Sequence, residues 1–273
     1  MFILGILLHE TGHLFGGLLA GYRFLHIEMF GFSLEKINGR YRFMHYRHTP
    51  IGQCLMYPCD LKKNGYSLIL GGIAMNLIAS SLFFVLCILL SVFWIKLFFL
   101  ISSIVNLSLA LMNIFGSETS DGRTFLEVKN KSVNMKSYNI LMLITKYLRE
   151  GRSYQDMPED LFSEDDYTES REDGLEKKAD SIKRELDIHR NRYLIESGRK
   201  SYVSDKDRLF GTSIGDILKK YDRLAEKSAY DEKKVFLEIA EQGKGSMYPG
   251  EYLSAARCFI LSQRNKKKVH KSI

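Results

Sequence analysis

Two histidines and one glutamate lie close together near the start of the chain, in the segment His9-Glu10-Thr11-Gly12-His13. The surrounding stretch is apolar and predicted to be helical, so residues four positions apart share one helix face and both imidazoles can bind one zinc ion. Glu10 lies one step round the helix and can take the proton from a water molecule at the metal. The segment therefore predicts metal-assisted hydrolysis.

The surroundings of this motif carry very few charges. Only 13 of the 71 Lys, Arg, Asp and Glu residues fall in positions 1–118. Ionisable side chains inside a membrane helix are costly, so such a cluster demands a compensating role such as metal binding. An open zinc site needs three protein ligands, and the third must come from another segment. A polar cluster that merely packs helices together is the competing interpretation.

Three apolar stretches are each long enough to cross a membrane, and they cover residues 2–21, 66–94 and 97–115. A purely soluble protein is therefore excluded. We expect an irregularity at Gly71-Gly72, because the second stretch is longer than a bilayer requires. Lys96 is expected to mark a tight turn between the second and third spans.

The segment between the first two spans is expected to form a small β-hairpin. Residues 24–46 alternate in polarity, and Asn38-Gly39 is typical of a two-residue type I′ turn. The loop as a whole carries seven basic and three acidic residues, so the positive-inside rule places it in the cytoplasm. Three spans then leave the C-terminal tail on the same side of the membrane.

The tail is polar and is predicted to be mainly helical. Helices are expected at about 132–150, 168–196, 212–227, 229–242 and 249–264. The fold class is therefore an α-helical multi-pass membrane protein with about three spans, a small β-hairpin insertion and a cytoplasmic, mainly α-helical tail. Residues 1–130 form the predicted membrane core and residues 131–273 the cytoplasmic helical domain.

Charge and cysteine content exclude two further classes. The net charge of +7 divides almost evenly between the apolar part and the tail, so no nucleic-acid partner is expected. The four cysteines lie far apart, and Cys87 falls within an apolar run, so no disulfide framework is expected.

Two more segments accompany the first motif. Gly72 and Asn76 form a G-x-x-x-N pattern, and Asn113 precedes the pair Asp121-Gly122. In this order the three motifs resemble the site-2 protease family of intramembrane zinc metalloproteases, over roughly residues 1–130.

The resemblance implies a role for six residues. His9, His13 and Asp121 would bind Zn²⁺, and Glu10 would be the catalytic base. Asn76 and Asn113 would help to bind substrate, although an interhelical hydrogen bond is an equally open interpretation of Asn76.

The chain departs from the family pattern at one position. The proline expected three residues after Asn113 is Gly116 here. Proline would break the third helix and turn Asp121 back toward the zinc, whereas glycine only permits such a break. In a straight helix Asp121 would lie too close to the cytoplasmic surface, and Glu118 would be the alternative third ligand.

The resemblance implies a zinc-dependent endopeptidase that hydrolyses peptide bonds in or near the membrane segments of anchored proteins or peptides. One edge of the hairpin Phe32–Tyr46 is expected to pair with the extended substrate. The expected partners are this substrate, the lipid bilayer of the cell membrane and a cytoplasmic protein bound by the tail. Two alternatives stay open: a catalytically inactive scaffold or receptor that retains the fold, and a metal carrier.

Overall fold

The computed structural model describes residues 1–45, 51–116, 120–129, 134–163, 181–199, 214, 217–218, 221, 232–242 and 248–271. The chain forms two compact units, Met1–Met142 with Thr168–Ile182 and Leu143–Tyr167 with Lys183–Ile273. Most described residues are helical, and one small antiparallel sheet lies in the first unit.

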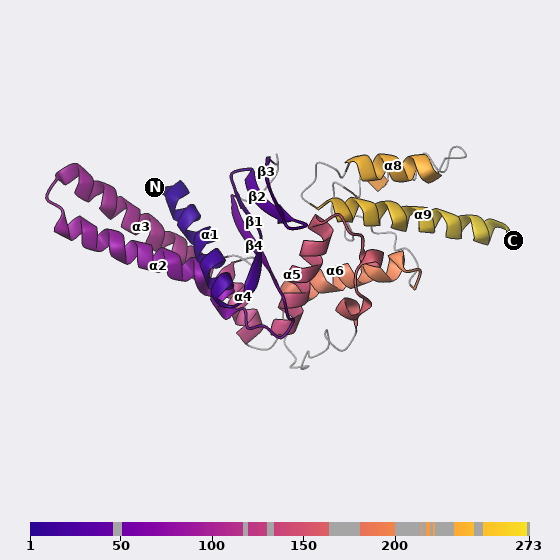
Figure 1. The fold of residues 1–273 in the computed structure, drawn as a ribbon, viewed down its shortest axis with the longest axis horizontal. Helices are drawn as coiled ribbons and strands as arrows, with labels where there is room; N and C mark the ends of the chain where they lie inside the picture. Colours follow the sequence, from indigo (N-terminus) through magenta and orange to yellow (C-terminus); the bar gives the residue numbers. More distant parts are fainter. Residues whose placement is uncertain are drawn as a thin grey trace. The chain divides into compact units, whose positions relative to one another are not determined.

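The first unit contains three long apolar helices, the sheet and a short helix. Its elements are α1 (Phe2–Leu19), β1 (Tyr22–Met29), β2 (Phe32–Ile37), β3 (Arg40–His45), β4 (Gly52–Pro58), α2 (Tyr66–Leu89), α3 (Phe93–Phe115), α4 (Asp121–Lys129) and the start of α5 (Met135–Arg149). Figure 1 shows α2 and α3 running side by side, and α1 contacts both of these helices as well as the sheet.

The helices α1, α2 and α3 are long and apolar enough to cross a membrane. Many of their large apolar side chains have little protein around them. Leu89, Trp94 and Phe115, for example, are 72%, 74% and 80% exposed. Because such a surface is unfavourable in water, the helices are consistent with membrane association.

The predicted boundary between the second and third spans is wrong. The structure ends α2 at Leu89 and begins α3 at Phe93, so Lys96 lies in the first turn of α3 and not in the connection. The chain turns where Leu90 adopts an extended conformation. A lysine near a helix end can extend its amine toward a polar surface and therefore does not need to occupy the turn.

The irregularity predicted at Gly71-Gly72 is also wrong, because α2 is continuous through both residues. These glycines instead allow α1 and α2 to approach closely. A Cβ atom at Gly12 would collide with the carbonyl group of Gly71, and one at Gly16 with the carbonyl group of Ser67. Small residues are typical of closely packed membrane helices.

The sheet is larger than the predicted hairpin. Its strand order is β3-β2-β1-β4, and every neighbouring pair is antiparallel. The predicted turn is confirmed: Asn38 and Gly39 have φ values of 51° and 77°, as a type I′ turn requires, and Ile37 pairs with Arg40 across it. The strand β4 was not predicted, and it pairs with β1 beside α1.

The chain reverses after α3 and brings α4 back against it. The helix α3 ends at Phe115, and Gly116 has an extended backbone. Gly122 lies so close to the end of α3 that a Cβ atom there would be 2.8 Å from the carbonyl oxygen of Asn113 and would also collide with that of Ile114. Glycine at both positions thus permits the break that proline would enforce.

The second unit is built from helices that pack around their own core. It contains the end of α5, two short 3-10 helices η1 (Tyr154–Asp156) and η2 (Glu159–Phe162), α6 (Ser181–Glu196), α8 (Glu232–Gln242) and α9 (Pro249–Lys271). The core includes Ile195, Leu218, Ile239 and Phe259. The predicted helix 168–196 is described from residue 181 onward, and most of the predicted helix 212–227 lies outside the described residues.

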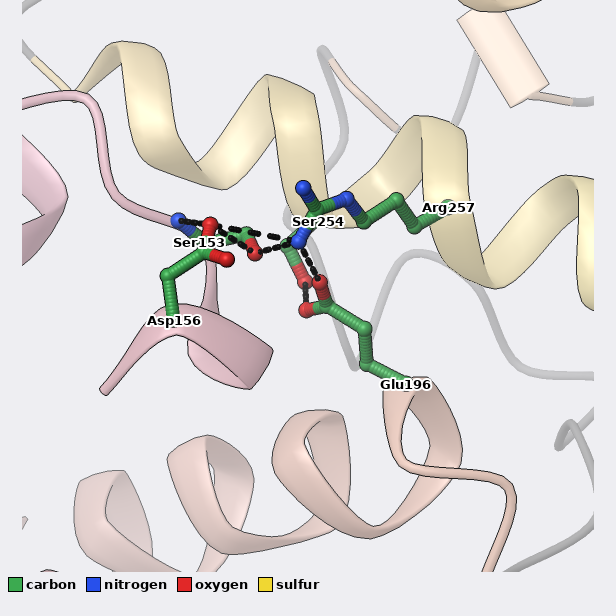
Figure 2. A network of polar contacts seen from close by, with 5 residues as sticks. All are labelled: Ser153, Asp156, Glu196, Ser254 and Arg257. Carbon is green, nitrogen blue, oxygen red and sulfur yellow. Dashed lines mark hydrogen bonds and ion pairs between the residues drawn. The ribbon is translucent and has the colours of Figure 1, made fainter. Parts of the chain in front are cut away.

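A polar network connects three segments of this unit that are far apart in the sequence. Figure 2 shows Arg257 of α9 reaching Asp156 of η1 at 3.2 Å and Glu196 of α6 at 3.1 Å. Arg257 also donates to the hydroxyl of Ser153, and Ser254 donates to Glu196 at 2.8 Å. Because Glu196 and Ser153 are buried, these bonds compensate for the cost of burying polar groups.

Candidate metal centre

The three ionisable residues of the first motif are buried on α1. His9, Glu10 and His13 are 8%, 6% and 9% exposed. The imidazole rings of His9 and His13 meet edge to face, with centroids 4.7 Å apart. Their Nε2 atoms point to the same place and lie 3.1 Å apart.

Asp121 completes a triangle of possible ligand atoms. Its Oδ2 atom lies 3.0 Å from Nε2 of His9 and 3.3 Å from Nε2 of His13. Ligand atoms about 2.0–2.1 Å from a tetrahedral zinc ion are about 3.3 Å apart, so the three separations fit one shared ion. Oδ2 is buried and accepts no well-directed hydrogen bond from the described residues, which also suits a metal ligand.

The position and charge of Asp121 favour this role. Asp121 begins α4, and the fold-back at Gly116 and Gly122 carries it to the histidines. Burial alone would raise the pKa of its carboxyl group, but the imidazoles of His13 and His9 lower that pKa to about 2. The group is therefore a carboxylate at neutral pH, as metal binding requires.

Both histidines have a polar partner on α2. Nδ1 of His13 lies 2.7 Å from the carbonyl oxygen of Leu68. A carbonyl oxygen can only accept, so Nδ1 carries a proton, and in the neutral ring Nε2 has its lone pair directed toward the other ligand atoms. Nδ1 of His9 lies 3.2 Å from the side-chain amide of Asn76, which is fully buried.

The carboxylate of Glu10 lies against β4. A Cβ atom at Gly52 would be 2.8 Å from Oε1 of Glu10, so only glycine leaves this space free. The backbone N–H of Cys54 donates a hydrogen bond to the same carboxylate. Burial, and then the charge of Glu10, raises the pKa of the Cys54 thiol to about 12, so the thiol stays protonated at neutral pH.

The structure thus brings together the four residues predicted to perform the chemistry: His9, Glu10, His13 and Asp121. Asn76 contacts a candidate ligand, which favours the hydrogen-bond interpretation over direct substrate binding. The side chain of Asn113 donates to the carbonyl group of Leu109 in its own helix, at 3.1 Å. The alternative ligand Glu118 lies outside the described residues.

The contributions of β4 and α5 to the site were not predicted from the sequence. Gly52 and Cys54 lie against Glu10. In the sequence, Gly52 was the only signal of this contact, and a glycine there is more typical of a turn than of a strand. Tyr138 of α5 packs beside Cys54, against the cluster that contains Leu68. Burial, followed by the charges of Tyr22 and Asp121, raises the pKa of the Tyr138 hydroxyl.

Comparison with known proteins adds no relative from which a function could be transferred. No family model matches the chain, and no curated protein or solved structure gives a significant match. The function of the chain is therefore inferred from the geometry of His9, His13, Asp121 and Glu10.

Proposed function

We propose that the protein is a zinc-dependent endopeptidase that hydrolyses peptide bonds in or near the membrane segments of anchored proteins or peptides. One observation supports this proposal most: three convergent ligand atoms from His9, His13 and Asp121 lie next to the buried carboxylate of Glu10. Three of these four residues, His9, Glu10 and His13, lie on α1, which is apolar enough to cross a membrane. The resemblance of its motifs to those of site-2 proteases leads to the same function.

Each of these residues has a distinct task in this proposal. His9, His13 and Asp121 would hold the zinc ion, which would supply Lewis-acid chemistry when bound. Glu10 removes a proton from the attacking water and passes it to the leaving amine. The main-chain amide of Cys54 positions the Glu10 carboxylate for both transfers, and the absence of a side chain at Gly52 leaves room for that carboxylate.

The proposed substrate must be extended before it is cut, because a helix keeps its carbonyl groups in internal hydrogen bonds. The strands β3 and β4 are the two edges of the sheet. A substrate that pairs with an edge would gain main-chain hydrogen bonds and lose its helical ones. The edge strand β4 lies directly beside Glu10, and β3 is the outer edge of the predicted hairpin.

The proposed setting is the cell membrane, with α1, α2 and α3 as spans and the tail in the cytoplasm. The excess of basic residues in the loop between α1 and α2 supports this orientation. The second compact unit, which we call the tail unit, would then offer a surface to a cytoplasmic protein partner that presents substrate or restrains the enzyme.

Replacement of Glu10 by glutamine tests the function. The chain is co-expressed with single-span membrane reporter proteins, and cleavage is followed by the appearance of shortened fragments. The Glu10→Gln variant should retain its metal and lose about 10²- to 10⁴-fold in cleavage rate, because the base is removed. Thr11→Ala, in the same motif but outside the proposed ligand set, is the matched control and should cleave normally.

The same experiment separates the alternative functions. A scaffold would show the same biological effect in the wild type and in the Glu10→Gln variant, and it would cut no reporter. A metal carrier would lose metal flux on replacement of His9 and would also cut none. Either result would contradict the proposed peptidase.

A further inference from the structure

We propose that Asn76 is a positioning residue for the candidate metal ligand His9, and that its side-chain oxygen accepts the Nδ1 proton of His9 when Nε2 of His9 binds metal. The inference rests on the proposed metal centre and adds to it a residue whose role is neither ligation nor contact with substrate. It also explains why an amide is buried at this point of the α1–α2 contact.

The contact between the two side chains is well defined. The amide nitrogen Nδ2 of Asn76 lies 3.2 Å from Nδ1 of His9, and Asn76 is fully buried. Its Oδ1 atom is also buried and has no hydrogen-bond partner among the described residues. One end of the amide is therefore used, while the other end is an orphan in an apolar helix bundle, which is costly.

Metal binding requires a particular form of His9. Its Nε2 atom faces Nε2 of His13 and Oδ2 of Asp121, so Nε2 must give its lone pair to the ion. The single proton of the neutral ring then belongs to Nδ1, which becomes a donor. Nδ2 of Asn76 is a donor as well, and two donors cannot pair.

A rotation of the Asn76 amide by 180° resolves this conflict. The rotation exchanges Nδ2 for Oδ1 without moving the rest of the side chain, and the former orphan becomes the acceptor for His9. An asparagine can thus pair with His9 whether or not the ring is bound to metal. An apolar residue of similar size could not form a hydrogen bond with either form of His9.

His13 shows that α2 supplies the same kind of support elsewhere in the site. Its Nδ1 proton is accepted by the carbonyl oxygen of Leu68 at 2.7 Å. The two imidazoles of one HExxH motif are therefore oriented from one neighbouring helix, through the main chain at Leu68 and the side chain at Asn76. The side chain is the part that substitution can remove.

The test measures metal affinity in the purified full-length chain, with no substrate present. Zinc affinity is measured by competition with a chromophoric chelator for the wild type, Asn76→Ala and Asn76→Asp. Loss of an outer hydrogen bond to a metal ligand costs about 10- to 100-fold in affinity, and this is the loss expected for Asn76→Ala. Asn76→Asp keeps an acceptor for the Nδ1 proton and should recover most of the affinity.

Asn106→Ala is the matched control. Asn106 is 1% exposed, and its Oδ1 atom has no hydrogen-bond partner within the described parts of the chain, but its Nδ2 donates within α3 to the carbonyl group of Ser102 at 2.8 Å. This variant loses the same number of atoms from the apolar helices and should bind zinc as the wild type does. Equal losses in Asn76→Ala and Asn106→Ala would overturn the inference.

A second measurement uses the wild-type chain and does not depend on the folding of any variant. In the zinc-loaded protein with ¹⁵N-labelled histidine, NMR should show His9 protonated at Nδ1 and bound to metal through Nε2. A His9 ring that binds metal through Nδ1 would overturn the inference. A wild-type chain that binds no zinc would instead contradict the proposed function, so the two failures are distinguishable.

Discussion

A Cβ atom added to Gly72 would lie 2.5 Å from Cε1 of His9 and 2.5 Å from Nε2 of His13. The two imidazoles therefore occupy the space that any other residue would fill. Gly72→Ala should shift at least one ring and cost about 1–3 kcal/mol through overpacking. Zinc affinity, measured by chelator competition, should fall about tenfold or more.

The control for this variant is Ala74→Val, which adds volume to an exposed position of the same helix. It should leave zinc affinity unchanged. If Gly72→Ala bound zinc as tightly as Ala74→Val, the close approach of α2 to the ligands would have no bearing on the metal.

Gly122 is the second glycine on which the site depends. Because a side chain there would meet main-chain carbonyl groups of α3, which cannot move cheaply, Gly122→Ala should displace α4 and with it Asp121. The expected result is weaker zinc binding in a protein whose helix content, measured by circular dichroism, is retained. Leu126→Ala, at an exposed position of α4, should bind zinc normally.

The edge strand β3 allows a test of substrate pairing. Phe43 is 70% exposed, and proline there would remove a main-chain N–H from the edge of the sheet. Cleavage of the membrane reporter should fall about fivefold, because one hydrogen bond contributes about 1 kcal/mol, while zinc content stays the same. Phe43→Ala removes the ring but keeps the N–H, so equal activity in the two variants would count against pairing at this edge.

Local patterns were sufficient to predict much of the membrane-associated part. The spacing of His9 and His13 specifies one helix face, and Asn38-Gly39 specifies its turn, because each depends only on neighbouring residues. The three apolar helices follow from the length of their predominantly apolar runs.

Other features depend on contacts between distant segments, so the sequence does not reveal them. Gly71 and Gly72 resemble helix breakers, yet packing against α1 keeps α2 continuous. Gly52 resembles a turn residue, yet it belongs to a strand because its partner is β1. The break of α3 at Gly116 depends on Gly122, which lies six residues further on and packs against the end of that helix.

The tail unit should lose stability in mild acid. Nδ1 of His189 accepts a hydrogen bond from Tyr154 at 2.6 Å, and Arg192 donates to the same Tyr154 oxygen at 2.8 Å. Burial, followed by the charge of Arg192, lowers the pKa of His189 well below 6.5. The unfolded chain therefore binds a proton below pH 6.5 that the folded chain does not, and stability falls as the pH falls.

The expected loss between pH 7 and pH 5 is about 2 kcal/mol from this one group. It can be measured on the full-length chain in detergent by pulse proteolysis in urea, with cleavage sites in the tail unit. His189→Gln should flatten this dependence, and His45→Gln, at an exposed position, should not. A tail unit equally stable at both pH values would show that His189 is not buried in its neutral form.

His9, His13 and Asp121 are proposed to hold one metal ion. The most direct test is elemental analysis of zinc in the purified wild-type chain and in the Asp121→Ala and Glu10→Gln variants. We expect about one zinc ion per chain in the wild type and in Glu10→Gln, and little in Asp121→Ala, because three protein ligands are needed. Absence of zinc from the wild type, or full zinc content in Asp121→Ala, would show that these three residues do not form the metal site.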